Sequence, residues 1–238
     1  MKHLVIYYIC TADYKLFFED FNRSIKNFYP EFNRTIIIIS DGLSEYNDYY
    51  DEEYNIHYKV KYIPHYPWPI NTLFKMKYIN DNIINCDYAF YFNADLMFNE
   101  QILNYKDFFK LELLNVSRHG NCEYYGNDEF GYDNNHYDRG QVENSMSYIP
   151  NKYTYVSGAI FGGNAEIFYQ MCNDIDMYVQ IDLKKRVIPI WHDESYLNKW
   201  CYVHKDKISI NKLYEFDVHH VNKYPFIYRY EQYHLKHK

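Results

Sequence analysis

Two adjacent carboxylates in this sequence could do chemistry, Asp193 and Glu194 in the run Trp191–Glu194 (Trp-His-Asp-Glu). A helix is expected over His192–Trp200, and the positive end of its dipole would favour carboxylates there. Ile188–Ile190, just before the run, has the apolar character of a short buried strand. A carboxylate delivered from such a strand could stabilise a positive charge or act as a nucleophile. The local pattern equally fits a helix cap, so it leaves both interpretations open.

A second polar group, Asn93 and Asp95, follows an expected strand over Tyr88–Phe92. Oxygen ligands suit Mg²⁺ and Mn²⁺, so Asp95 is a candidate contact for a cation that accompanies a diphosphate. An aspartate that caps a turn would give the same pattern. One carboxylate beside one amide predicts at most a weak metal site.

Small residues fill the segment Val156–Gly163, in which Ser157, Gly158 and Ala159 are consecutive. Without bulky side chains, the backbone of such a segment can approach a ligand closely. A tightly packed strand would need the same composition, so the segment by itself does not establish a site.

The elements that must position these groups alternate between strands and helices in the first half of the chain. The expected strands are Leu4–Ile9, Thr35–Ile39, His57–Ile63 and Tyr88–Phe92, and the expected helices are Phe17–Phe28 and Thr72–Ile84. This alternation predicts an α/β fold with a mainly parallel sheet covered on both faces. Ligands of such sheets lie beyond the carboxyl ends of the strands, which here are Ile9–Tyr14, Ser40–Gly42 and Asn93–Asp95.

The second half is less regular. A helix is expected over Glu166–Asp176, and Cys122–Asn144 has the composition of a long loop, where selectivity for a ligand could reside. Residues after Asp217 are basic and aromatic without periodicity, which fits a tail that folds over the site or a solvated end. No linker divides the chain, so a single domain over residues 1–238 is expected.

Composition excludes several classes of protein. The net charge of −7 argues against a nucleic-acid partner. No stretch reaches the roughly 18 apolar residues that span a bilayer, and the five scattered cysteines form no disulfide or zinc pattern. These features favour a cytoplasmic protein with free thiols, for which a peripheral membrane contact stays open. The 31 tyrosines could line a sugar site, but composition alone does not establish one.

Taken together, these segments resemble glycosyltransferase family six, the family of the histo-blood-group A and B transferases and the α1,3-galactosyltransferases. The run Trp191–Trp200 is close to the family pattern W-H-D-E-S-x-x-N-K-Y/W and is the most specific carrier. The other motifs, in family order, are Tyr8-Ile9-Cys10-Thr11, Trp68-Pro69, Asn71-Thr72-Leu73, Asn93–Phe98, Tyr148-Ile149-Pro150 and Ser157–Gly163. The likeness covers about residues 4–215 and is closest to the shorter bacterial members.

The resemblance implies a GT-A fold, which is a Rossmann-like nucleotide-binding mixed sheet with flanking helices. Residues 1–98 would then mainly bind UDP, and residues 99–215 would mainly bind the acceptor and carry out catalysis. The resemblance also implies transfer of a sugar from a UDP donor, with retention, to the 3-hydroxyl of a galactoside oligosaccharide, possibly fucosylated. Glu194 matches the acidic residue at the reaction centre. The implied donor contacts are Ile9, Cys10, Tyr14, Lys75, Asn93, Asp95, Ser157, Gly158, Ala159, Asp193, Lys199, Lys223 and Arg229. The implied acceptor contacts are His119, Trp191 and Glu194.

Two departures from the family pattern matter. The family's D-x-D motif is Asn93-Ala94-Asp95 here, so no obligatory cofactor is expected, and Mn²⁺ or Mg²⁺ at Asp95 stays an alternative. Lys75 stands where relatives carry an arginine, which keeps the charge and loses the two-pronged geometry. At the position that separates donors, Ala159 favours UDP-galactose over UDP-GalNAc, because its methyl group fills space near C2 of the sugar.

Two other classes of function compete with this interpretation. A carbohydrate-binding protein without catalysis could use the tyrosine-rich surface, but it would not need both the Trp191–Glu194 run and the Asn93–Asp95 turn. A degenerate transferase that acts as a scaffold would explain why Asn93 replaces an acidic residue. It would not explain why the Trp191–Lys199 run is intact. UDP release in the presence of an acceptor separates both from an enzyme.

Overall fold

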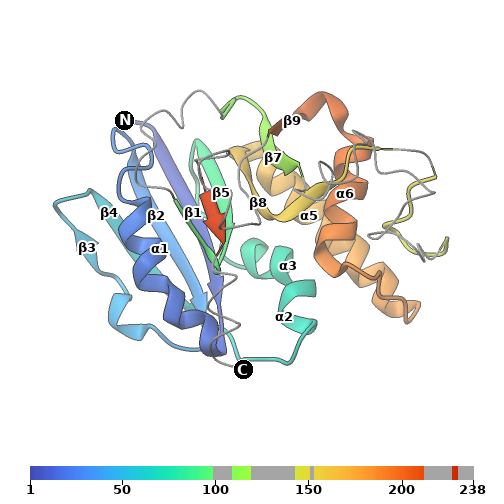
Figure 1. Ribbon diagram of the computed structural model, residues 1–238, viewed down its shortest axis with the longest axis horizontal. Helices are drawn as coiled ribbons and strands as arrows, with labels where there is room; N and C mark the ends of the chain where they lie inside the picture. The colour runs from blue at the N-terminus through green and yellow to red at the C-terminus, as the bar shows by residue number, and fades with distance from the viewer. Residues whose placement is uncertain (99–108, 119–142, 151–152, 212–226, 230–238) are drawn as a thin grey trace.

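The computed structural model describes residues 1–98, 109–118, 143–150, 153–211 and 227–229 (Figure 1). An eight-stranded sheet has the order β3-β4-β2-β1-β5-β8-β7-β9. Its strands are β1 (His3–Cys10), β2 (Asn33–Ser40), β3 (Tyr50–Asp51), β4 (Ile56–Tyr62), β5 (Tyr88–Asn93), β7 (Leu114–Arg118), β8 (Val156–Asn164) and β9 (Ile208–Asn211). A separate two-stranded sheet pairs β6 (Leu96–Phe98) with β10 (Ile227–Arg229).

The sheet is mixed, as the GT-A fold requires. Strands β1, β2, β4 and β5 run parallel to one another, whereas β3 is antiparallel to β4, and β8 is antiparallel to both β5 and β7. The chain adds β2 and β4 on one side of β1 and then returns to place β5 on the other side. This reversal opens a crevice beyond the carboxyl ends of β1 and β5, the position where open α/β sheets bind ligands.

Helices cover both faces of the sheet (Figure 1). The α-helices are α1 (Phe18–Ile25), α2 (Ile70–Leu73), α3 (Lys75–Asn80), α5 (Ala165–Lys184) and α6 (His192–Val203), and the 3₁₀ helices are η1 (Ala12–Phe17), η2 (Ser44–Tyr46) and η4 (Lys205–Lys207). Helix α1 packs on one face through Phe18, Phe21 and Ile25. Helices α3, α5 and α6 pack on the other face.

The alternation of side chains along β1 explains how one strand serves both cores. Leu4, Ile6 and Tyr8 belong to the α1 side, whereas Val5 and Tyr7 belong to the side of α3, α5 and α6. All five are at most 1% exposed, as expected for a central parallel strand buried on both faces. This continuous apolar run holds the ligand-binding edge of the sheet in place.

The strands expected in the first half of the chain are confirmed, each with bounds within two residues of those expected. Helix α6 begins at His192 as expected. Helix α5 is longer than expected and continues to Lys184. The short strands β6, β7 and β9 carry no pattern strong enough to reveal them, and they were missed.

Two expected elements are wrong. Ile188–Ile190 is an irregular connection and not a buried strand, with Ile188 45% and Ile190 47% exposed. Arg186, which has a positive φ of 59°, and Pro189 interrupt regular structure there. In place of the helix expected over Thr72–Ile84 there are two short helices, α2 and α3. They are separate because Phe74 does not have a helical backbone conformation, and α3 begins at Lys75.

Candidate active site

A cleft of about 470 Å³ opens at the carboxyl edge of the sheet. Its lining comes from residues 9–14, 65–75, 91–95, 157–159 and 191–194. These segments lie after β1, around α2, after β5, within β8 and at the start of α6. The sequence groups centred on Asn93, Gly158 and Glu194 therefore meet in one place, although about 100 residues separate the first from the last.

Glu194 lies in the floor of the cleft with both carboxylate oxygens engaged. Its Oε2 accepts a hydrogen bond from the Gly158 backbone N–H at 2.6 Å, and its Oε1 accepts one from the Tyr155 hydroxyl at 2.7 Å. Burial raises the pKa of the Glu194 carboxyl to about 7, against the lowering effect of these two hydrogen bonds. The charge of neighbouring Asp193 adds to the rise. The carboxylate is thus held rigidly where its ionisation falls near neutral pH.

Lys75 and Asp193 form an ion pair beneath this carboxylate. The Lys75 Nζ lies 2.6 Å from Asp193 Oδ2, and both side chains are almost fully buried. The same ammonium donates to the Gly158 carbonyl at 2.9 Å and lies 4.4 Å from the centre of the Tyr91 ring. Burial lowers the pKa of Lys75, but the charge of Asp193 and its hydrogen bond outweigh this and raise the pKa above its ordinary value. Lys75 is therefore a permanent positive charge.

Asn93 and Asp95 lie at the end of β5, as the sequence predicted. The side-chain Oδ1 of Asn93 accepts a hydrogen bond from the Tyr91 hydroxyl at 2.7 Å and faces the Lys75 ammonium at 3.4 Å. Asp95 is 7% exposed and lines the cleft. Within the described residues there is no group of three or more His, Cys, Asp or Glu side chains that could hold a metal. A cation here would depend on the single carboxylate of Asp95, since the Asn93 oxygen already faces an ammonium.

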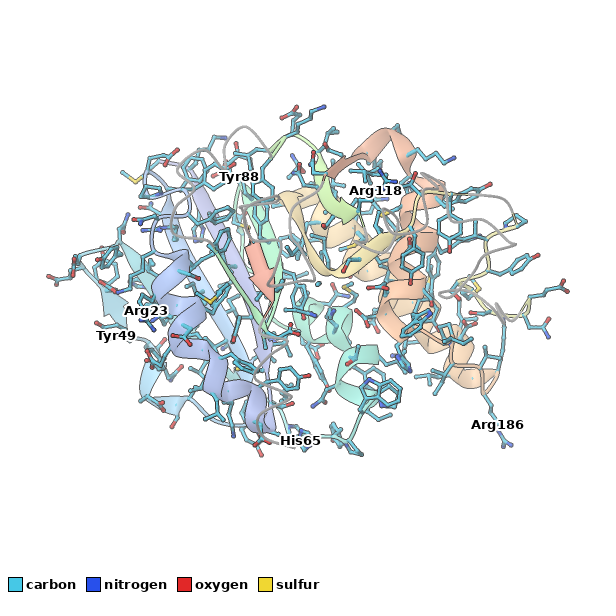
Figure 2. All side chains as sticks on the ribbon, viewed as in Figure 1. Arg23, Tyr49, His65, Tyr88, Arg118 and Arg186 are labelled. Atoms are coloured by element: carbon cyan, nitrogen blue, oxygen red, sulfur yellow. The ribbon has the colours of Figure 1, made fainter. Side chains whose placement is uncertain are left out.

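The loop after β1 is fixed by a carboxylate that directly follows β2. Asp41 accepts a hydrogen bond from the Ala12 N–H at 3.2 Å and forms an ion pair with Lys15 at 2.9 Å. Ala12 has a positive φ of 51°, which needs such support. The Thr11 hydroxyl lies 3.2 Å from a ring nitrogen of His65. Figure 2 shows His65 at the lower edge of the view, where β1 and β2 end.

Aromatic side chains form the mouth of the cleft. The rings of Trp68 and His192 meet edge to face, with centroids 4.7 Å apart. Trp68 is 75% exposed and Trp191 is 37% exposed, so flat apolar surface faces solvent. Exposed aromatic faces of this kind suit the apolar faces of sugar rings.

Two predicted donor contacts lie outside the lining. Cys10 is 1% exposed in the core beside α1, where burial raises the pKa of its thiol to about 12. Neighbouring side chains in a strand point to opposite faces, so Ile9 can face the cleft only if Cys10 does not. Lys199 lies on α6 five residues after Glu194, about 140° around the helix, and its ammonium donates to the Tyr148 carbonyl at 2.7 Å.

Three further predicted contacts have no described side chain. His119 and Lys223 lie outside the described residues, as do residues 122–142 of the expected acceptor loop. For Arg229 only the backbone is described, in the pairing of β10 with β6. The remaining predicted residues line the cleft: Ile9, Tyr14, Lys75, Asn93, Asp95, Ser157, Gly158, Ala159, Trp191, Asp193 and Glu194.

Sequence reasoning missed two tyrosines. Tyr91 could have been found from strand alternation, because it lies two residues before Asn93 and so faces the same side of β5. Tyr155 precedes β8 and no local pattern marks it. Its hydroxyl reaches Glu194 only through the packing of β8 against α6.

Comparison with known proteins agrees with this geometry. The model of glycosyltransferase family 6 matches residues 64–234, more than half of the chain. The O-antigen biosynthesis glycosyltransferase WbnI of Escherichia coli is 29% identical over 218 residues, which cover 88% of this chain and 86% of that protein.

The mixed sheet and the cleft at its carboxyl edge define a GT-A-like glycosyltransferase. The chain belongs to glycosyltransferase family 6. The resemblance seen in the sequence is thereby confirmed, and with it a nucleotide-sugar donor and a separate acceptor. In the described part of the chain, no helix has the length and apolar character needed to cross a membrane.

The pKa of Glu194 predicts how stability depends on pH. The folded protein holds the Glu194 proton more tightly than the unfolded chain, so the contribution of Glu194 to stability falls as pH rises from about 4.5 to about 7 and then stays level. Glu194→Gln removes this loss. We therefore expect the difference in thermal midpoint, variant minus wild type, to increase by roughly 3 °C or more between pH 4.5 and pH 8. A change of about 1 kcal/mol has this effect in a domain of this size.

Differential scanning calorimetry of both proteins across this range measures the effect. Glu112→Gln, at an exposed carboxylate outside the cleft, is the matched control and should show no such divergence. Parallel midpoints for wild type and Glu194→Gln would contradict a raised pKa at Glu194.

Proposed function

We propose that this protein is a retaining α1,3-galactosyltransferase that moves galactose from UDP-galactose to the 3-hydroxyl of a galactoside acceptor, as a blood-group-B-type transferase does. The observation that carries the proposal is the half-buried carboxylate of Glu194, held by Gly158 and Tyr155 in the lining of the cleft. The relative named for O-antigen biosynthesis supports a lipopolysaccharide glycan as acceptor.

The lining of the cleft suits both halves of the donor. Ile9, Tyr14, Asn93 and Asp95 line it beyond β1 and β5, where a nucleoside diphosphate binds in open α/β sheets. Ser157, Gly158 and Ala159 line it beside Glu194, and their small side chains would leave room for a hexose there. The exposed faces of Trp191 and Trp68 then lie at the mouth, where an acceptor sugar would approach.

Charge determines the chemistry. When the bond between galactose C1 and the diphosphate breaks, the electron pair leaves with UDP and the sugar becomes an oxocarbenium-like cation. Glu194 offers the negative charge that stabilises this cation, as a nucleophile or as an electrostatic partner. The acceptor 3-hydroxyl then forms the new bond at C1, and its proton passes to the released UDP oxygen.

The donor sugar is assigned from Ala159, which lines the cleft and is 3% exposed. Its methyl group reduces the space for an acetamido group near C2, which favours galactose. The second candidate function is the same transfer from UDP-GalNAc, in the manner of a blood-group-A transferase.

Transfer is proposed to be independent of a metal. Asp95 is the one carboxylate in the Asn93–Asp95 turn, and the Asn93 oxygen faces the Lys75 ammonium. A site with these donors does not fit a tightly held Mg²⁺ or Mn²⁺, because such ions need several oxygen ligands. A weak cation contact at Asp95 is the alternative.

The Glu194→Gln variant tests the role of the carboxylate. The neutral amide cannot stabilise a developing cation, so we expect the rate of sugar transfer to fall at least ~100-fold, a typical loss for a key electrostatic group. The measurement is UDP release from UDP-galactose with a panel of small galactosides. Glu112→Gln should keep wild-type activity, and near-wild-type transfer by Glu194→Gln would overturn the assignment. If the wild type releases no UDP, the carbohydrate-binding alternative gains support.

Competition between the two donors tests the role of Ala159. Wild type should prefer UDP-galactose over UDP-GalNAc, and Ala159→Gly should shift this preference toward UDP-GalNAc by roughly 10-fold, since one methyl in a pocket contributes ~1–3 kcal/mol. Ala89→Gly, at a buried strand position outside the cleft lining, is the matched control. A wild type that turns over UDP-GalNAc preferentially would refute the donor assignment.

Chelation tests the metal. Activity in excess EDTA should stay within about twofold of that without it, because cationic and N–H groups of the protein are proposed to stabilise the departing diphosphate. Complete loss that Mn²⁺ restores would contradict this and assign Asp95 as a metal ligand.

A further inference from the structure

Lys75 is expected from the family resemblance to contact the donor, but its surroundings leave no hydrogen for that contact. An ammonium group has three N–H donors. Its nitrogen lies 2.6 Å from Asp193 Oδ2, 2.9 Å from the Gly158 carbonyl oxygen and 3.4 Å from Asn93 Oδ1. The Tyr91 ring covers it from a further side, and Lys75 is only 5% exposed.

We propose that Lys75 is a positioning residue for transfer, which orients Glu194 through the Gly158 backbone and holds Asp193 and Asn93 directly, and that it does not bind the donor. The proposal rests on the function proposed above. A lysine in the lining of a cleft would ordinarily be expected to bind the ligand, whereas here it positions other side chains.

The connection to Glu194 passes through a single residue. The carbonyl oxygen of Gly158 accepts from Lys75, while the N–H of Gly158 donates to Glu194 Oε2. The space around this residue is tight, since an added Cβ would lie 3.1 Å from Asp193 Oδ2 and 3.3 Å from Glu194 Cβ. The carbonyl and the N–H belong to adjacent peptide units that meet at the Gly158 Cα within β8, so anchoring the carbonyl restrains the unit that carries the N–H, and with it the Glu194 carboxylate.

Asn93 is oriented by the same ammonium. Its Oδ1 faces two donors, the Lys75 ammonium and the Tyr91 hydroxyl. The amide NH₂ group must therefore point away from both. Because Asn93 lines the cleft, this arrangement leaves N–H donors for an anionic ligand.

Charge balance is the second part of the role. Asp193 and Glu194 are adjacent, and two uncompensated buried carboxylates would oppose each other's ionisation. The positive charge of Lys75 offsets Asp193 and also lowers the pKa of Glu194. Without it, Glu194 would hold its proton to a higher pH and could not stabilise a sugar cation at neutral pH.

The test compares Lys75→Met with wild type in two assays. We expect UDP affinity, measured by calorimetry, to stay within about threefold, and kcat to fall at least ~10-fold. The ascending limb of kcat/KM against pH should move up by roughly one pH unit, the effect of losing one opposite charge a few ångströms away. Lys77→Met, at an exposed lysine of the same helix that pairs with Asp81, is the matched control and should change none of these.

Lys75→Met leaves the Asp193 charge buried and unpaired, which destabilises the fold. Lys75→Arg is therefore the second variant, and it should keep the ascending limb at its wild-type pH because the charge remains. A tenfold loss of UDP affinity with kcat and the limb unchanged would show that Lys75 contacts the donor, and would overturn the proposal. An upward shift of the limb in Lys75→Arg would also overturn it.

A titration without substrate separates this proposal from the proposed function. The pH at which the thermal midpoints of a protein and its Glu194→Gln counterpart diverge reports ionisation of Glu194. That pH should be higher in the Lys75→Met background than in wild type, even if no UDP-sugar is turned over. Equal values in the two backgrounds would refute the role of Lys75, whatever the enzyme's substrate.

Discussion

The active site depends on one buried ion pair, that of Lys75 with Asp193. A buried charge pair costs desolvation energy, and it persists only where further hydrogen bonds satisfy the remaining groups. Here the Gly158 carbonyl supplies such a bond, and through Gly158 the pair is linked to Glu194. Helix α3, strand β8 and helix α6 are thus joined at a single ammonium. The Glu194 carboxylate, which we propose acts at the reaction centre, takes its position from this junction.

The order of strands explains why the junction lies in a cleft. The sheet grows from β1 in one direction and then in the other, so the loops after β1 and β5 diverge and leave a crevice. Strand β8 then enters antiparallel to β5 and brings small residues to the edge of that crevice. Helix α6 packs against β8 and places Asp193 and Glu194 in the lining of the same cleft. A donor that lies along the crevice would present its sugar to Glu194.

The site gives up stability for function. Burial removes water from the Glu194 carboxylate, which makes its ionised form less stable and raises its pKa to about 7. Ala12 takes a left-handed conformation that Asp41 has to support. Such strained or poorly solvated groups concentrate where a protein binds its ligand, because the surrounding fold can hold them. The buried apolar run of β1, packed on both faces, provides that support.

The sequence by itself determined the strands of the first half, the start of α6, the family and half of the residues that line the cleft. These follow from local causes, since apolar runs, helix starts and a ten-residue motif are properties of short segments. Only the tertiary structure decided that Cys10 faces the core, that Lys199 binds the Tyr148 carbonyl and that Ile188–Ile190 is exposed. It also placed Tyr155 against Glu194 and surrounded the Lys75 ammonium with oxygen atoms of Asp193, Gly158 and Asn93. Those outcomes depend on which elements pack together, because hydrogen bonds between residues dozens of positions apart leave no periodic trace in the chain.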